Sequence, residues 1–259
     1  MAQGVKRETR RGAAMAAPAP NLDVFINCPF DAQYDPFFYA AVFTVVRLGY
    51  RARCALEADN AGDSRLLKII KIIGECRFAM HDISRTELSE TTKLPRFNMP
   101  LELGLWLGAH HLGGADQCDK SCIVFDVVTD RYGKFISDIS GQDIHAHDGK
   151  VDQLISELAA WLRQQGAKHV AGGKAILGEY EQFRKILPII CRNQNMTSDE
   201  LKFADFNIIV TNYIADFIHR PAEPSEATKS DPAPSHDRAA SAATIASPPA
   251  GNRRPKILP

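Results

Sequence analysis

Residues 22–57 read LDVFINCPFDAQYDPFFYAAVFTVVRLGYRARCALE, and this stretch decides the fold. The apolar run 22–28 is rich in strand-forming residues and stops at Pro29, as a buried strand does. A helix is predicted over 35–48, because its opening Asp-Pro pair is an N-cap and N1 signal and Gly49 follows its end. The stretch therefore begins a strand–helix–strand unit, the building block of a parallel sheet.

The same alternation of strand and helix continues along the chain. Further strands are predicted at 50–57, 77–83, 121–128 and 143–146, and further helices at 64–76, 98–112 and 151–165. Alternating strands and helices predict helices on both faces of a parallel sheet. We therefore expect an α/β domain over 21–166, a doubly wound (flavodoxin-like) five-stranded parallel sheet.

The segments outside this domain differ in composition. Residues 174–218 contain two helical patterns after a linker-like stretch, 167–173, and they predict an appended C-terminal helical hairpin. That hairpin either packs on the main domain or mediates self-association into a homo-oligomer. Residues 1–20 are basic and rich in Ala and Pro, which predicts a disordered leader and also fits a transit peptide. The Pro, Ala and Ser content of 219–259 predicts a disordered tail.

Composition limits the classes of function. Lys+Arg and Asp+Glu are equal at 31 each, so the chain shows no basic excess and no clear nucleic-acid surface is expected. No apolar run reaches the roughly 18 residues of a membrane span, and we expect a cytoplasmic protein without a membrane partner. The six cysteines form no CxxC pair, so neither a disulfide framework nor a metal site is expected.

Polar side chains follow the predicted strands at their carboxyl ends, where open parallel sheets bind ligands. After these strands and at the starts of the next helices we therefore expect substrate-binding residues: Asn27, Pro29, Phe30, Asp31, Glu57, Arg65, Ser84 and Asn98. Asp82, which ends the third strand, is a candidate catalytic acid. Its alternative role is to accept backbone N–H groups in the turn that follows.

Glu102 is the second candidate for catalysis. Pro100 fits position N1 of the helix 98–112, which places Glu102 at about N3. A carboxylate there could serve only the helix terminus, with a gain of about 0.3–1 kcal/mol. The helix is apolar nearly all round, however, and a buried Glu is costly unless it faces a pocket. We therefore predict a reactive carboxylate that the helix N-terminus keeps ionised, as a nucleophile requires.

Three short motifs carry a resemblance to a known family. The chain has FINCPFD at 25–31, HDIS at 81–84 and NMPLELG at 98–104. Together they resemble the nucleoside 2-deoxyribosyltransferase family, which shares a wider superfamily with TIR domains. The resemblance covers about residues 22–165.

The resemblance implies roles for individual residues. Glu102 matches the nucleophile that attacks the anomeric carbon of the sugar, and Asp82 matches the acidic position that assists the base or the sugar. Phe30 matches the aromatic residue that lines the base pocket. Asn27 stands where the family often has Gly or Ala, and the loop 84–96 also departs from the pattern, which puts the substrate in doubt.

Three functions follow from these observations as hypotheses. The first is a hydrolase, an N-glycosidase that cleaves the sugar–base bond of NAD or a related nucleotide, and the resemblance to TIR domains makes a bacterial defence effector one of its roles. The second is a nucleoside 2-deoxyribosyltransferase, and the third a non-catalytic nucleotide-sensing module. Each takes a small-molecule nucleotide or nucleoside as its partner, and none needs a cofactor, because NAD would be a substrate.

Overall fold

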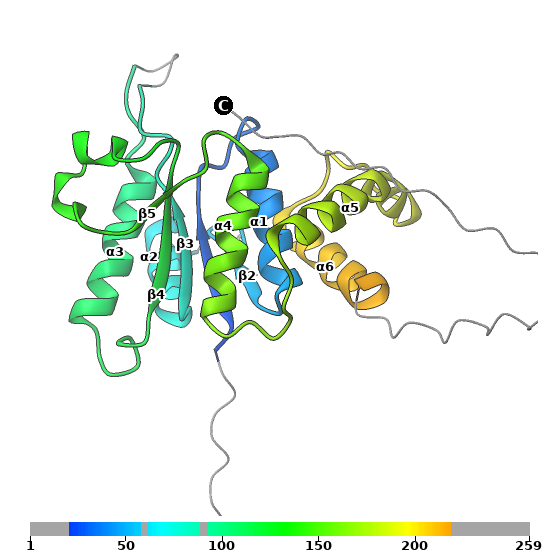
Figure 1. Ribbon diagram of the computed structural model, residues 1–259, viewed down its shortest axis with the longest axis horizontal. Helices are drawn as coiled ribbons and strands as arrows, with labels where there is room; N and C mark the ends of the chain where they lie inside the picture. Colours follow the sequence, from blue (N-terminus) through cyan, green and yellow to red (C-terminus); the bar gives the residue numbers. More distant parts are fainter. Residues whose placement is uncertain (1–20, 58–61, 89–92, 219–259) are drawn as a thin grey trace, which may run out of the picture. The chain divides into compact units, whose positions relative to one another are not determined.

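A computed structural model describes residues 21–57, 62–88 and 93–218 (Figure 1). The predicted leader, 1–20, and the predicted tail, 219–259, lie outside the described residues. Within the described ranges, no helix combines the length and apolar character needed to cross a membrane. All six cysteines are free thiols, and the described side chains contain no group of three ligands placed to hold a metal ion.

Five parallel strands form one sheet in the order β2-β1-β3-β4-β5. The strands are β1 (Asp23–Asn27), β2 (Arg51–Arg53), β3 (Phe78–Asp82), β4 (Ser121–Asp126) and β5 (Ile144–Ala146). Val24 of β1 pairs with Ala52 on one side and with Phe78 on the other. This strand order is that of a flavodoxin-like sheet, so the predicted fold class is confirmed.

Helices cover both faces of the sheet (Figure 1). They are α1 (Asp35–Arg47), α2 (Arg65–Glu75), α3 (Asn98–Leu112) and α4 (Val151–Gln164), with short 3-10 turns at Arg131–Lys134 and Ser137–Ile139. Side chains of β1 alternate between the faces: Val24 and Ile26 pack beneath α1 and α4, whereas Phe25 packs beneath α2 and α3. Burial on both faces explains why the strand is apolar throughout.

Two further helices add a layer outside α1 and α4 (Figure 1). They are α5 (Gly173–Asn193) and α6 (Phe203–Tyr213), the latter continued by a π-helical turn, Ile214–Ile218. Phe183 and Phe206 are fully buried in the same core as Phe43 of α1. Arg47 of α1 also pairs with Glu179 of α5, with 2.6 Å between Nε and Oε2. Of the two alternatives for the hairpin, the structure therefore shows packing on the main domain.

The stretch 167–173, predicted as a linker, is held against the domain. Ala171 is buried in the main core, and its carbonyl accepts a hydrogen bond of 2.8 Å from Arg163 Nη1. Gly173 packs so closely on Ser156 that a Cβ there would lie 2.7 Å from its Cα. The stretch connects α4 to α5 as predicted, and its small residues allow it to pack closely on the domain.

If α6 belongs to the main core, Phe206→Ala should destabilise the whole domain. The ring lies 5.8 Å from Phe183 and 4.5 Å from Tyr39, and its removal leaves a cavity. We expect the free energy of unfolding to fall by about 3–5 kcal/mol, measured by urea denaturation. Ile208→Ala, on the exposed side of the same helix, is the control and should have little effect. Equal stability of both variants would contradict a shared core.

Candidate functional site at the carboxyl edge of the sheet

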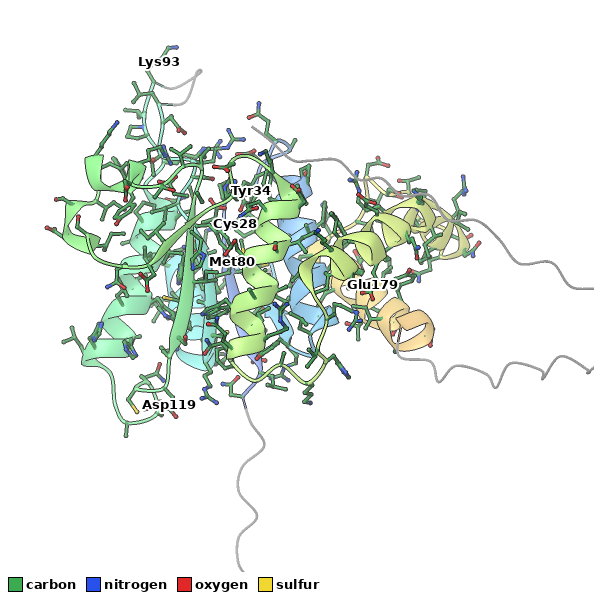
Figure 2. The ribbon with its side chains drawn as sticks, in the orientation of Figure 1. Cys28, Tyr34, Met80, Lys93, Asp119 and Glu179 are labelled. Atoms are coloured by element: carbon green, nitrogen blue, oxygen red, sulfur yellow. The ribbon has the colours of Figure 1, made fainter. Side chains whose placement is uncertain are left out.

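The connections from β1 and β3 make a switch point in the sheet. The chain leaves β1 toward β2 on one side, and it later returns to place β3 on the other side of β1. Loops that follow β1 and β3 therefore diverge at the carboxyl edge, where such folds bind ligands. Figure 2 shows Cys28 and Tyr34 toward this edge, with Asp119 at the opposite end of the sheet.

Asp82 ends β3 and is fully buried. Its Oδ2 accepts a hydrogen bond from the hydroxyl of Tyr34, and its Oδ1 accepts one of 2.9 Å from the amide of Ser84. His147 Nε2 lies 3.3 Å from Oδ2 without the alignment of a hydrogen bond. The amide of Gly149 donates to His147 Nδ1, so the neutral ring carries its proton on Nε2, facing the carboxylate. Groups from the loops after β1, β3 and β5 therefore surround the carboxylate of Asp82.

Tyr34 and His147 are not among the predicted site residues. Tyr34 precedes α1 and is joined to Asp82 across 48 positions of sequence, which no local pattern reveals. His147 alternates with His145, whose ring instead contacts Glu157 at 3.0 Å. The two histidines therefore point to different partners.

Asn27, predicted to bind substrate, is used inside the fold. Its Nδ2 lies 2.9 Å from both the carbonyl of Met99 and Nδ1 of His81, so it fastens α3 to β1 and β3. Burial lowers the pKa of His81 to about 3, which keeps the ring neutral and able to accept this hydrogen bond. The amide at this position thus has a structural explanation.

Glu102 lies two residues deeper in α3 than predicted. The helix begins at Asn98, so Glu102 is its fifth residue and lies beyond the first turn, where free backbone N–H groups favour a carboxylate. Burial raises the pKa of its carboxyl to about 7, while the nearby Arg65 guanidinium acts in the opposite direction. The expectation that the helix N-terminus keeps this group fully ionised was therefore wrong.

The carboxyl of Glu102 is buried, and at least one of its oxygens lacks a hydrogen bond to any described residue. Its exposed fraction is 7%, and its Oε2 has no hydrogen-bond partner among the described residues. A buried polar atom without a partner lowers stability by about 1–3 kcal/mol, more if it is charged. Packing alone does not explain this carboxyl, so it is the candidate for direct contact with a ligand.

Cys28, the first residue after β1, is influenced by acidic groups from both faces of the sheet. Burial raises the pKa of its thiol, and the carboxylates of Asp82, Glu102 and Asp31 raise it further. Asp82 belongs to the side of β3 that faces α1 and α4, whereas Glu102 comes from α3 on the other face. The two candidate catalytic carboxyls therefore approach the end of β1 from opposite sides of the sheet.

A pocket of about 510 Å³ opens at the same edge. The loops after β1 and β3 line it with Asp31, Ala32, Gln33, Arg85, Glu87, Leu88 and Arg96. Arg96 Nη1 lies 2.8 Å from Asp31 Oδ2, and Arg85 Nη2 lies 3.2 Å from Asp31 Oδ1. Asp31 was predicted here, but the two arginines were missed because they lie in a loop with no regular pattern. Neither Glu102 nor Asp82 is among the lining residues.

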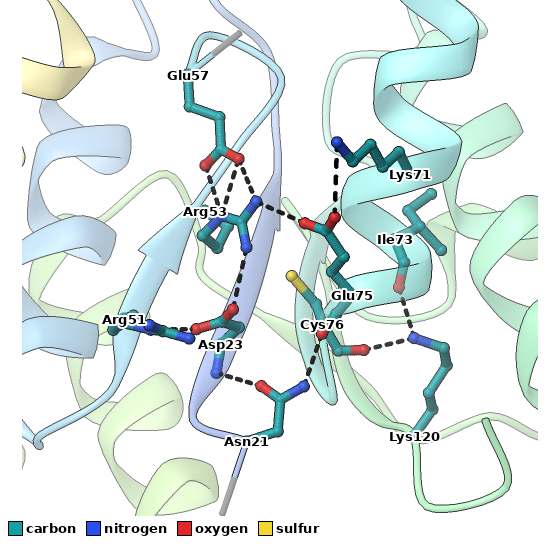
Figure 3. Close-up of polar contacts among 10 residues, drawn as sticks. All are labelled: Asn21, Asp23, Arg51, Arg53, Glu57, Lys71, Ile73, Glu75, Cys76 and Lys120. Carbon is teal, nitrogen blue, oxygen red and sulfur yellow. Dashed lines mark hydrogen bonds and ion pairs between the residues drawn. The ribbon is translucent and has the colours of Figure 1, made fainter. Parts of the chain in front are cut away.

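Glu57 lies in a different part of the fold (Figure 3). Its Oε1 is 2.5 Å from Arg53 Nη2, and Arg53 also contacts Asp23 and Glu75, each at 3.0 Å. Asp23 begins β1 and Glu75 ends α2, so this network lies away from the carboxyl edge. Glu57 therefore does not join the predicted residues at the carboxyl edge, because β2 ends at Arg53 and the turn that follows places the Glu57 carboxylate against the Arg53 guanidinium.

The remaining predicted residues divide between core and surface. Pro29 is buried, and the ring of Phe30 packs edge-on against Phe38 with 5.4 Å between centroids. Arg65 and Asn98 are exposed at the first residues of α2 and α3. Of these, Arg65 acts electrostatically on Glu102 and so belongs with that carboxyl.

Removing the hydroxyl of Tyr34 should weaken the carboxyl edge. Tyr34→Phe leaves Asp82 buried with one donor fewer, and we expect the free energy of unfolding to fall by about 1–3 kcal/mol. Denaturant unfolding at neutral pH measures the change. Tyr39→Phe is the matched control, because the hydroxyl of Tyr39 makes no hydrogen bond to the loops at this edge among the described residues. A loss as large in the control would contradict this role.

The raised pKa of Glu102 predicts a pH-dependent stability. Between its ordinary value of 4.5 and about 7, the folded chain binds more protons than the unfolded chain, so this group lowers stability as pH rises. Glu102→Gln removes the titration. As pH rises from 4.5 to about 7, the free energy of unfolding of the variant should therefore increase relative to that of the native chain. Above about pH 7 the difference should become constant. A difference that stays constant with pH would contradict the raised pKa. Glu181→Gln, exposed on α5, is the matched control variant.

No family model matches the chain, and no curated protein matches it. Among solved structures it is similar to the TIR domains in the structure of the activated Roq1 resistosome directly recognizing the pathogen effector XopQ. The two share 14% identity over 75% of this chain and 84% of that chain, with a TM-score of 0.32. A likeness this distant does not carry a function over to the present chain.

Proposed function

We propose that the chain is an N-glycosidase that cleaves the sugar–base bond of NAD or a related nucleotide, with Glu102 acting on the sugar. The observation that carries the proposal is the buried carboxyl of Glu102, whose Oε2 lacks a partner among the described residues. Its charge acts on the Cys28 thiol at the switch point, and the Arg65 guanidinium acts on Glu102 in turn. A polar ligand group at this edge would satisfy the carboxyl that the fold leaves unsatisfied.

A carboxyl with a pKa of about 7 suits this chemistry. Cleavage of the bond passes through an oxocarbenium-like state, which an ionised carboxylate stabilises or traps covalently. Near neutral pH the Glu102 side chain can exchange between its protonated and ionised forms, and bound positive charge on the sugar would favour the ionised form. Binding of the developing cation and ionisation of Glu102 therefore favour each other.

The contacts of Asp82 favour NAD over a nucleoside with a neutral base. A neutral base is a poor leaving group and needs a general acid, whereas nicotinamide departs from a cationic ring and needs none. Both oxygens of Asp82 are engaged, by Tyr34 and by the Ser84 amide. Asp82 is therefore a positioning residue in this proposal, and base exchange by a deoxyribosyltransferase is the second candidate.

The proposal includes a biological role for the cleavage reaction. The resemblance to TIR-like proteins favours a role as a bacterial defence effector that acts on a small molecule in the cytoplasm. Helices α5 and α6 use their inner faces for the core. Self-association through these helices would therefore involve their outer faces.

Incubation of the pure chain with NAD, and separately with a panel of nucleosides, tests the proposal by chromatography of the products. We expect release of nicotinamide, and a rate that rises with pH through about 7, because the ionised form of Glu102 is the active one. Glu102→Gln should lower kcat by at least about 100-fold and largely spare KM. Glu181→Gln, exposed on α5, is the control.

Each other outcome contradicts part of the proposal. Base exchange among nucleosides without nicotinamide release would favour deoxyribosyl transfer. A nucleotide that raises the melting temperature but is not cleaved would favour a sensing module. Unchanged turnover in Glu102→Gln would overturn the role of this residue, and a rate that falls as pH rises would indicate that it acts as an acid.

A further inference from the structure

The pocket after β1 and β3 contains an unusual charge arrangement. The guanidinium groups of Arg85 and Arg96 both contact the single carboxylate of Asp31, one at each oxygen. We propose that these two arginines clamp a phosphate group of the ligand, and that Asp31 is an internal anion which this phosphate displaces. The inference rests on the proposed function, since it names the part of the nucleotide that the site recognises.

The charges around the pocket support an anionic ligand. Two positive groups share one negative group at Asp31. The other acidic residue of the lining, Glu87, is held by Arg131, with 2.7 Å between Oε1 and Nη1. Glu87 therefore does not neutralise the pair, and the cluster of Arg85, Arg96 and Asp31 retains an excess positive charge.

The same arrangement selects phosphate over a simple carboxylate. A ligand must interact with the arginines more strongly than Asp31 does in order to replace it. A carboxylate offers one charge and two oxygens, as Asp31 already does. A phosphate monoester or diphosphate offers more charge and further oxygens, and guanidinium forks bind these groups through paired N–H donors.

The turn that carries Asp31 can survive the displacement of its side chain. The backbone carbonyl of Asp31 accepts hydrogen bonds of 2.8 Å from the Tyr34 amide and 3.1 Å from the Asp35 amide. Its carboxylate adds contacts of 3.1 Å with the amides of Gln33 and Tyr34. The backbone contacts hold the start of α1 in place when the carboxylate turns away from the arginines.

The size of the pocket fits more than a phosphate. A volume of about 510 Å³ lies within the range of roughly 300–1,000 Å³ typical of small-molecule sites. Ala32 and Leu88 add an apolar wall beside the charged groups. The pocket can therefore hold a phosphate together with part of a nucleoside, at the same sheet edge as Glu102.

Calorimetric titration with inorganic phosphate, diphosphate, AMP and adenosine tests the clamp in the full chain. We expect AMP and diphosphate to bind and adenosine to bind at least about tenfold more weakly. Arg85→Gln and Arg96→Gln should each weaken AMP binding about tenfold, and Arg96→Lys should recover only part of the loss. Asp31→Asn should strengthen AMP binding, because the competing charge is gone. Arg192→Gln, exposed at the end of α5, is the control.

The outcomes separate the clamp from the catalytic proposal. Equal binding of AMP and adenosine, or unchanged AMP binding in both Gln variants, would overturn the clamp. Weaker or unchanged AMP binding in Asp31→Asn would overturn the displacement by phosphate. Circular dichroism confirms that each variant is folded. AMP binding without NAD cleavage would leave the clamp standing and the glycosidase proposal overturned. If Arg85→Gln and Arg96→Gln cleave NAD with unchanged KM, the glycosidase proposal stands and the clamp is overturned.

Discussion

The buried carboxylate of Asp82 organises the edge of the sheet on which every proposed activity depends. A carboxylate without solvent is costly unless donors surround it, and three loops supply groups that face this one. Tyr34 comes from the loop after β1, Ser84 from the loop after β3 and His147 from the loop after β5. Because these contacts converge on one side chain, the positions of the loops are coupled. The loops after β1 and β3 also form the wall of the arginine-lined pocket.

Two acidic residues at one edge have opposite environments, and this difference assigns their roles. Asp82 has both oxygens engaged, whereas Glu102 keeps an unpaired oxygen and a pKa raised to about 7 by burial. Their side chains approach the end of β1 from opposite faces of the sheet. A satisfied carboxylate supports the scaffold, while an unsatisfied one is available to a ligand.

Local patterns accounted for most of the fold but for less of the site. Apolar runs and helix signals found every strand and helix of the domain, since burial on both faces leaves a continuous record in sequence. They overestimated β2, because Cys54 and Ala55 are buried in a turn rather than in a strand. They gave the bounds of α3 as observed, but the assignment of Pro100 to position N1 put Glu102 two residues too near the start of the helix. Arg85 and Arg96 were missed because loops carry no periodicity.

The amino-acid sequence is enough to predict the α/β class, the parallel sheet and the polar residues near the ends of β1 and β3. These properties depend on neighbours along the chain, and hydrophobic periodicity records them directly. The tertiary structure is needed to know which of these polar residues contact one another. Asn27 contacts His81, Glu57 contacts Arg53 and Asp82 contacts Tyr34. One oxygen of Glu102 has no partner among the described residues. The physical reason is that burial and electrostatic partners depend on contacts between distant segments.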